Sequence, residues 1–202
     1  MYSPKIQKLI ELFSRFPGIG PKTAARFVFF LTRNSKSENQ EFAKAISALK
    51  EIKICKFCRK FHQENNELCS ICSNKARHNG ILCIIEKETD LVTIENTNLY
   101  PGLYFILGAS LLALKKQGLA EERINEARKK IKNPQNFGLE GKFKEIILAL
   151  NPTPQGETTA LFLERTFSDL AKITRLGRGL PIGGEIEYAD RETILLAFSN
   201  RK

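Results

Sequence analysis

The sequence has no long apolar run. Its longest such runs, Phe27 to Leu31 and Ile81 to Ile85, are far shorter than the roughly 20 residues that a membrane-spanning helix needs. The first residues also lack the apolar stretch of a secretory signal. We therefore expect a cytoplasmic protein without a membrane span, whose cysteines stay reduced and form no disulfides.

A phosphate loop of the form Gly-x-x-x-x-Gly-Lys-Ser/Thr is also missing, which argues against an ATPase because such enzymes cradle their nucleotide with that loop. Internal repeats and low-complexity tracts are absent as well. The hydrophobic fraction of 42% and the charged fraction of 27% are those of an ordinary globular protein. A length of 202 residues suits a mid-sized domain with small appendages.

The formal net charge of +10 is distributed unevenly along the chain. Residues 1–54 contain 10 basic and 4 acidic residues, residues 55–78 contain 5 and 2, and residues 79–202 contain 17 and 16. A basic excess concentrated in one region suits a polyanion such as nucleic acid, whose phosphates attract lysine and arginine without regard to sequence. The alternative is a basic surface that only contacts solvent.

Helical periodicity dominates the first 50 residues. Ser3 and Pro4 predict the start of a helix that runs to about Phe16, a Pro-Gly segment breaks it, and a second helix starts at Pro21. A third helix fits Glu41 to Lys50. The apolar positions that we expect to face inward are Ile6, Leu9, Ile10 and Phe13 in the first helix, Ala24, Phe27, Val28 and Leu31 in the second, and Phe42, Ala45, Ile46 and Leu49 in the third.

The turn between the first two helices has the composition of a phosphate-binding hairpin. Gly18 and Gly20 permit unusual backbone dihedrals and a close approach to a ligand, and the following helix N-terminus carries a partial positive charge. Lys22, Arg26 and Arg33 fall on the helix face opposite the apolar stripe. A simple turn would have the same glycines, but with its flanking helices and basic face the segment predicts a sequence-tolerant, salt-dependent contact with DNA.

After Gly80, short apolar runs alternate with helical patterns, which predicts a parallel sheet. The expected strands are residues 81–85, 103–107, 146–150 and 172–175, and the expected helices include residues 120–131, 157–167 and 191–198. Cys83 lies inside the first strand, where a free cysteine is usually a small buried hydrophobe.

Two Cys-x-x-Cys pairs, Cys55 with Cys58 and Cys69 with Cys72, are the strongest chemical signal in the chain. Each pair can bind one cation with two sulfurs, and together they complete a tetrahedral thiolate site for one structural zinc ion. A redox pair or two disulfides would be the alternatives. All four positions are filled by protein, so the site leaves no open position for catalysis. We interpret His62 and His78 as structural or surface residues rather than ligands.

These motifs together resemble the RecR family of bacterial recombination mediators over essentially the full length of the chain. The matching segments follow the family's order: the hairpin residues 16–26, the cysteine cluster, and residues 77–86, 151–160 and 174–190. The resemblance implies an α/β protein in four parts. These are a helix-hairpin-helix domain at residues 1–54, a four-cysteine zinc finger at 55–78, a Toprim-type parallel sheet domain at 79–170 and a C-terminal Walker-B-like segment at 171–202.

The resemblance also implies partners. Subunits of the family assemble into a ring-like homotetramer that encircles single- or double-stranded DNA, with Lys22 and Arg26 on the DNA-facing hairpin. With RecO, and in many bacteria RecF, the family loads RecA onto strands covered by single-strand-binding protein during recombinational DNA repair. The RecO contact would lie on a Toprim face that carries Glu86, Gln155 and Glu157, where Gln155 replaces the family's usual acidic residue.

A catalytic Toprim domain would need a glutamate after its first strand and an Asp-x-Asp pair after a later one, because Mg²⁺ requires hard oxygen ligands. Glu86 fills the first position, but Asn151, Pro152 and Thr153 stand where the pair would be. We therefore expect a protein that is not an enzyme. The alternatives are a Mg²⁺-dependent Toprim nuclease or topoisomerase-like enzyme, which would draw on Glu157, Glu185, Glu187 or Asp190, and a zinc-ribbon protein that binds RNA or protein.

Overall fold

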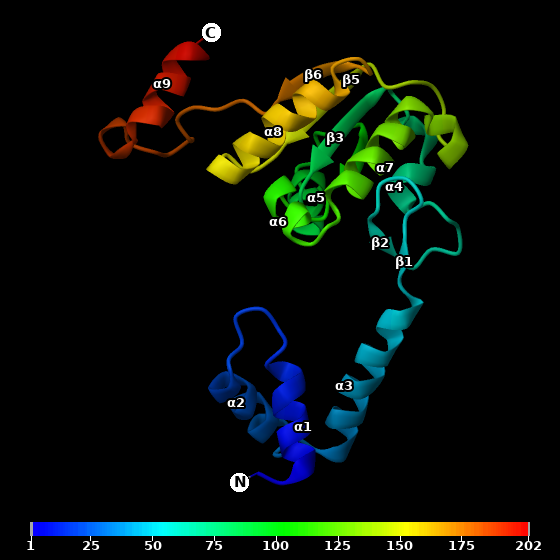
Figure 1. Ribbon diagram of the computed structural model, residues 1–202, viewed down its shortest axis with the longest axis vertical. Helices are drawn as coiled ribbons and strands as arrows, with labels where there is room; N and C mark the ends of the chain where they lie inside the picture. Colours follow the sequence, from blue (N-terminus) through cyan, green and yellow to red (C-terminus); the bar gives the residue numbers. More distant parts are fainter. Residues whose placement is uncertain (1, 202) are drawn as a thin grey trace. The chain divides into compact units, whose positions relative to one another are not determined.

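The computed structural model describes residues 2–201, which divide into two compact units, Met1–Ile52 and Lys53–Lys202 (Figure 1). The first unit is helical: α1 (Pro4–Phe13), α2 (Pro21–Leu31), α3 (Lys36–Ala48) and the short 3₁₀ turn η1 (Leu49–Glu51). Proline stands at the first position of both α1 and α2, where its missing N–H costs no helical hydrogen bond. Ile10, Ala24 and Val28 form the small core between these two helices.

The third helix differs from its prediction in two respects. It begins at Lys36 rather than Glu41, because Ser35 and Glu38 form a reciprocal capping box at its start. Its apolar face is not buried: Phe42 and Ile46 are 48% and 52% exposed. Leu49 lies beyond the helix in η1 and is 60% exposed, since no described part of the chain covers this face.

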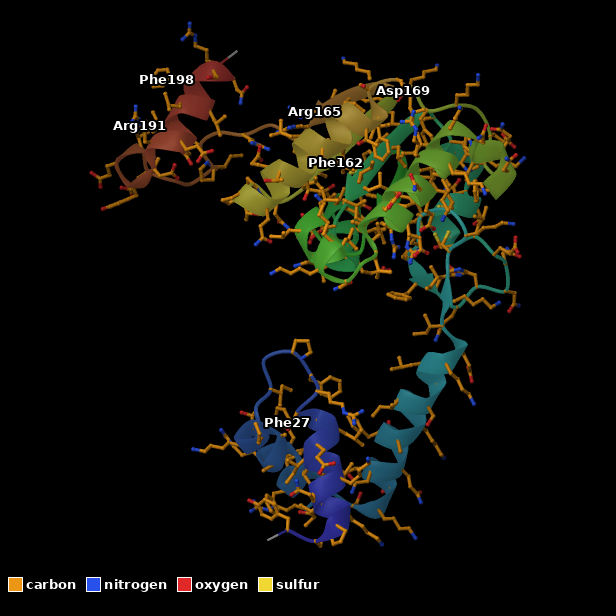
Figure 2. The ribbon with its side chains drawn as sticks, in the orientation of Figure 1. Phe27, Phe162, Arg165, Asp169, Arg191 and Phe198 are labelled. Carbon is orange, nitrogen blue, oxygen red and sulfur yellow. The ribbon has the colours of Figure 1, made fainter. Side chains whose placement is uncertain are left out.

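The first two helices also correct the sequence reading in detail. α1 ends at Phe13, and residues 14–16 continue only as a turn in which the Phe16 N–H donates to the Phe13 carbonyl. Phe27, expected in the buried stripe of α2, is 42% exposed (Figure 2). Leu9 of α1 is 40% exposed. The two helices therefore bury only a narrow seam against each other.

The second unit is built on a four-stranded parallel sheet of order β4-β3-β5-β6. Its strands are β3 (Ile81–Ile85), β4 (Leu103–Ile106), β5 (Glu145–Ala149) and β6 (Lys172–Arg175). All four predicted strands are confirmed. β3 and β6 have the predicted residues, β4 ends one residue earlier than predicted, and β5 begins and ends one residue earlier. β3 is central and nearly continuous in apolar residues, as expected for a strand covered on both faces.

Helices cover the sheet and connect its strands: α5 (Glu88–Glu95), α6 (Leu111–Lys116), α7 (Ala120–Lys132), the 3₁₀ turn η3 (Pro134–Phe137) and α8 (Pro154–Phe167). α7 and α8 lie side by side, joined by the ion pair of Arg128 with Asp169 at 2.5 Å (Figure 1). The core between helices and sheet includes Leu82, Phe105, Ile146, Leu163 and Phe167.

Two smaller segments flank the sheet. The cysteine segment before it contains the antiparallel pair β1 (Lys53–Ile54) and β2 (Phe61–His62), α4 (Ser70–Ser73) and η2 (Lys75–Arg77). The C-terminal segment contains η4 (Ile186–Tyr188) and α9 (Arg191–Ser199), in which no residue is fully buried. Across residues 2–201, no helix combines the length and the apolar character needed to cross a membrane.

Candidate nucleic-acid interface and metal centre

The hairpin between α1 and α2 presents backbone amides at a helix start. Gly18 has a φ of +76°, a conformation that glycine adopts at little cost. Gly20 is the extended N-cap of α2 and makes no side-chain capping hydrogen bond. The amides of Lys22 and Thr23 in the first turn therefore have no partner inside the helix. Such amides, together with the helix dipole, form an anion-binding arrangement.

Basic side chains lie along α2 and just beyond it. Lys22 and Arg26 are exposed in the first half of α2, on the side away from the buried Ala24 and Val28, and Arg33 is exposed just past the C-terminal end of the helix. None of the three makes an ion pair with another residue of the described range 2–201. Their charges are therefore available to a ligand, as the sequence predicted for this face.

The structure brings the four cysteines together. One ligand atom from each of Cys55, Cys58, Cys69 and Cys72 lies within 4.8 Å of all the others, and all four residues are buried. The Cys58 and Cys69 sulfurs are 3.5 Å apart. The β1–β2 turn supplies the first pair, and α4 with its N-cap supplies the second. This arrangement can hold a metal ion.

The chemistry of the donor set fits a soft or borderline cation. Hydrogen bonding from Cys58 lowers the pKa of the Cys55 thiol, and hydrogen bonding to Cys55 raises the pKa of the Cys58 thiol. Four neighbouring thiolates would repel one another unless a cation lay between them. Backbone N–H groups of Lys60 and Cys69 point at the sulfurs of Cys58 and Cys55, each at 3.4 Å. These amides would stabilise thiolate charge around a bound ion.

Contacts from the cysteine loops reach several parts of the sheet domain. The Cys58 carbonyl accepts a hydrogen bond from the Ile106 N–H of β4 at 3.0 Å. The Phe57 carbonyl accepts one from the buried Lys130 ammonium of α7 at 3.1 Å. Lys130 also pairs with Glu126 at 2.6 Å. The cysteine cluster and the sheet are thus packed as one unit.

The two histidines lie near the cluster but are not part of it. His78 places Nε2 2.9 Å from the Cys72 carbonyl oxygen, and its Nδ1 accepts from the Glu140 N–H at 3.1 Å. His62 is buried, with Nδ1 2.6 Å from a Glu64 oxygen. His78 therefore connects the second cysteine pair to the loop before β5.

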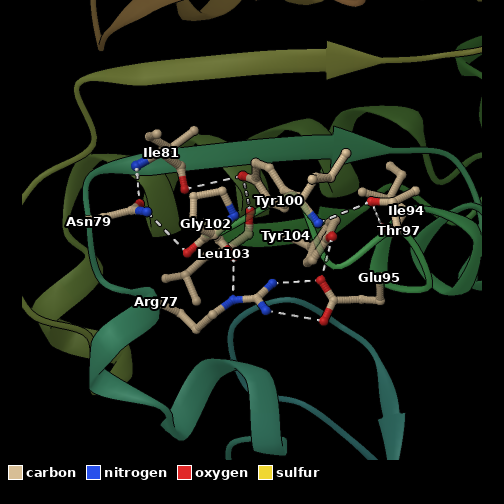
Figure 3. A network of polar contacts seen from close by, with 12 residues as sticks. Arg77, Asn79, Ile81, Ile94, Glu95, Thr97, Tyr100, Gly102, Leu103 and Tyr104 are labelled. Atoms are coloured by element: carbon tan, nitrogen blue, oxygen red, sulfur yellow. Dashed lines mark hydrogen bonds and ion pairs between the residues drawn. The ribbon is translucent and has the colours of Figure 1, made fainter.

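A polar network continues from the cysteine segment into the edge of the sheet (Figure 3). The Arg77 guanidinium donates to both carboxylate oxygens of Glu95, at 3.2 and 2.6 Å, and to the Gly102 carbonyl at 2.9 Å. The Tyr104 hydroxyl donates to the same carboxylate at 2.6 Å. This bidentate pair connects η2 to α5 and to the start of β4.

At the carboxyl end of the strands, the predicted partner-binding residues have different environments. Glu86 is buried, and its carboxylate accepts a hydrogen bond from the Asn151 side chain at 3.3 Å. Gln155 is exposed at the start of α8. Glu157 pairs with Arg178 and, at 2.9 Å, with Arg175. The hydrogen bond from Arg178 lowers the pKa of the Glu157 carboxyl.

The structure does not assemble carboxylates around Glu86. Among the described residues, the four cysteines form the one group of three or more cysteine, histidine or acidic side chains that could share a metal ion. Sequence reasoning missed that Arg175 and Arg178 neutralise Glu157, since these residues are distant in sequence. It also missed the buried Lys130, for which the (i, i+4) spacing from Glu126 was the available signal.

A helix-hairpin-helix unit, a cluster of four cysteines that could hold a metal ion and a parallel sheet domain define the class of this protein. Sequence models of known families match residues 6–50 as "RecR, helix-hairpin-helix", 80–177 as "Toprim domain" and 179–202 as "RecR, C-terminal". The chain belongs to the RecR family of recombination proteins.

Named relatives match the chain from end to end. Recombination protein RecR of Bifidobacterium animalis subsp. lactis (strain AD011) is 37% identical over 203 residues, which cover 100% of this chain and 97% of the relative. That of Hydrogenovibrio crunogenus (strain DSM 25203 / XCL-2) is 38% identical over 204 residues, covering 100% and 99%. That of Moorella thermoacetica (strain ATCC 39073 / JCM 9320) is 37% identical, covering 100% and 98%.

Proposed function

We propose that this protein is a non-catalytic, sequence-tolerant DNA clamp that acts with RecO, and in some settings RecF, to load RecA onto strands covered by single-strand-binding protein. The observation that carries the proposal is the hairpin, whose free first-turn amides and unpaired Lys22 and Arg26 lie together at the start of α2. Contacts of this kind read phosphates rather than base edges, so they bind DNA of any sequence.

We infer that the clamp is a closed homo-oligomer, with a tetramer as the simplest form. A tetramer with dihedral symmetry needs two different self-complementary surfaces on each subunit. The first unit offers an apolar groove of about 340 Å³ whose lining includes Leu9, Phe13, Phe42 and Ile46. The C-terminal segment offers another apolar surface: Tyr188 and Phe198 are 80% and 65% exposed. Solution mass tests this point, since a monomer could not encircle a duplex.

The metal that we propose for the cysteine cluster is one zinc ion per subunit. Four thiolates match the preference of Zn²⁺ for sulfur in a closed tetrahedral site. A bound Zn²⁺ with four thiolates contributes a charge of about −2, so the positive charge available to DNA lies mainly in the helical unit. Metal analysis of the purified protein tests the identity of the ion.

The proposal is tested by replacing Lys22 and Arg26 with alanine together. DNA binding at moderate salt should be lost, while metal content and oligomer mass stay at the wild-type values. Lys36→Ala with Lys44→Ala is the matched control, because both lysines are exposed in the same unit but lie on α3. Wild-type affinity for DNA in the hairpin variant would refute the assignment of Lys22 and Arg26 as DNA-binding residues.

Two experiments separate the alternatives. Incubation with Mg²⁺ and nicked, linear or gapped DNA tests a Toprim enzyme, and reproducible cleavage that is lost in Glu86→Gln would overturn the non-catalytic assignment. Comparison of DNA and RNA binding over a salt series tests the zinc-ribbon alternative. RNA binding as tight as DNA binding would contradict the clamp.

A further inference from the structure

A second group of unpaired basic side chains lies in the sheet domain, far along the sequence from the hairpin. Lys132 ends α7, Lys142 and Lys144 precede β5, and Lys172 begins β6. We call these four residues the lysine edge. All four are exposed, and within residues 2–201 none of them forms an ion pair.

The topology brings the lysine edge together at one end of the sheet. β5 and β6 are parallel neighbours with Glu145 opposite Lys172, and the Lys172 N–H donates to the Lys144 carbonyl at 3.1 Å. Lys132 lies close to the turn that leads into β6: the pKa of Asp169 in that turn is lowered by its hydrogen bond with Arg128 and also by the charge of Lys132. The lysine edge therefore marks the amino end of the strands.

Nearby carboxylates do not cancel this charge. Asp169 is paired with Arg128 at 2.5 Å and Glu140 with Lys75 at 2.6 Å. Glu145 is partly buried and accepts a hydrogen bond from the Thr174 hydroxyl at 2.7 Å. The amino end of these strands thus carries four lysines without ionic partners, although residues 79–202 as a whole are nearly charge-balanced. This local excess suits a polyanion.

The surroundings favour nucleic acid over an acidic polypeptide. Protein partners usually anchor on buried apolar or aromatic groups, but no exposed large hydrophobic side chain occurs among the described residues 120–160 or 163–175. The absence of exposed aromatic rings there also leaves no platform on which the bases of a single strand could stack. What remains is charge, which suits the phosphate backbone of a duplex.

We propose that the lysine edge is a second duplex-binding surface of this protein, separate from the hairpin. It rests on the proposed function in that the protein must be a DNA-binding protein. The lysine edge lies at the amino end of the strands, whereas Gln155 and Glu157 lie at the carboxyl end. Duplex DNA and a protein partner can therefore occupy opposite ends of one sheet at the same time.

The salt dependence of duplex binding tests the proposal in the full-length protein. Each lost lysine–phosphate contact lowers the slope of log affinity against log salt by about 0.9, so Lys144→Gln with Lys172→Gln should lower it by about 1.8. The matched control is Lys115→Gln with Lys116→Gln, two exposed lysines in the last turn of α6. The control should keep the wild-type slope, and both variants should keep the wild-type metal content and circular dichroism.

Lysine acetylation followed by mass spectrometry gives a readout that needs no variant. A bound duplex should slow acetylation of Lys144 and Lys172 several-fold and leave Lys115 and Lys116 unchanged. An unaltered slope in the variant, or equal acetylation with and without duplex, would overturn the proposal. Protection by poly-glutamate but not by duplex would overturn it in favour of an acidic polypeptide.

Failure of the lysine edge is distinguishable from failure of the proposed function. If the wild-type protein binds no DNA, the clamp itself is wrong. If the hairpin variant loses duplex binding while the Lys144 and Lys172 variant keeps the wild-type slope, only the lysine edge is wrong.

Discussion

Substitution of Gly156 by alanine should destabilise the sheet domain although the glycine lies in a helix. Gly156 is buried in the first turn of α8, where its N–H donates to the Thr153 hydroxyl at 3.2 Å. A Cβ added there would lie 1.9 Å from the carbonyl oxygen of Asn151 and 3.0 Å from its carbonyl carbon. These are backbone atoms of the loop that follows β5, so α8 and the loop would have to move apart.

Two effects of opposite sign compete in this substitution. Alanine in place of glycine inside a helix gains about 1 kcal/mol. Forcing backbone apart in a packed site costs about 1–3 kcal/mol, and losing the hydrogen bond from Asn151 to the buried Glu86 adds about 1–3 kcal/mol. The clash therefore dominates, and we expect a net loss of about 1–5 kcal/mol in the free energy of unfolding.

Urea unfolding followed by circular dichroism measures this loss, and hydrogen exchange should locate it in β5 and α8. For a protein of this size each 1 kcal/mol corresponds to about 2–4 °C in Tm, so the melting temperature should fall by about 2–20 °C. Gly177→Ala is the matched control, because a Cβ at Gly177 would meet nothing within 4 Å. Unchanged stability of Gly156→Ala would refute the steric reasoning.

Four further predictions concern the metal centre and the ion pairs. Cys58→Ser should give misfolded or aggregated protein, because the metal contributes to folding; a soluble, metal-free, cooperatively folded variant would contradict this. In the folded, metal-loaded protein Cys83 should not react at pH 8 in a thiol titration, since burial raises its pKa to about 12; reaction of Cys83 in folded protein would refute its burial. Lys130→Met should speed metal release to a chelator and lower the free energy of unfolding by about 1–3 kcal/mol, because the Phe57 carbonyl loses its hydrogen-bond donor. An unchanged rate of metal release would argue against a role of Lys130 in stabilising the first cysteine loop. Glu157→Gln should destabilise the protein fully above the ordinary glutamate pKa of about 4.3. The destabilisation should disappear as the pH falls through the lowered pKa of the paired Glu157 carboxyl, because protonation removes the pairing in the wild type as well. Urea midpoints of both proteins over a pH series check this, and a stability difference between them that grows on acidification would contradict it.

Sequence periodicity predicted the elements well where local signals were strong. Residues 81–85 and 172–175 are strands with the predicted bounds. The first of them is a short apolar run between Gly80 and Glu86, which specifies a strand directly. The start of α3 was wrong although its signal was present, since Ser35 and Glu38 have the spacing of a capping box. The Ser-x-x-Glu spacing of a capping box therefore indicates a helix that starts at Lys36.

Burial was harder to predict than secondary structure. The spacing of Phe27, Phe42 and Ile46 indicates an apolar face, but periodicity cannot say whether anything covers that face. In the described chain these side chains are 42%, 48% and 52% exposed. The answer depends on tertiary and subunit contacts, which local spacing does not encode.

The functional residues also divide into those that local spacing predicts and those whose contacts depend on the fold. The spacing of the four cysteines sufficed to predict their cluster, because two Cys-x-x-Cys pairs can together supply the four ligands of one metal ion. The pairing of Glu157 with Arg175 and Arg178 depends on how β6 and the chain after it pass α8. Such long-range ion pairs follow only from the fold.

The cysteine cluster supports the sheet domain through separate contacts on its two Cys-x-x-Cys loops. The first loop accepts hydrogen bonds from β4 and from α7 through the carbonyls of Cys58 and Phe57. The second is connected through the Cys72 carbonyl to His78, which in turn accepts from the Glu140 N–H of the loop before β5. A cation that holds the two loops together therefore holds β4, α7 and the approach to β5 in register. The same approach carries Lys142 and Lys144, so loss of the metal should weaken duplex binding at the lysine edge even though no cysteine contacts DNA.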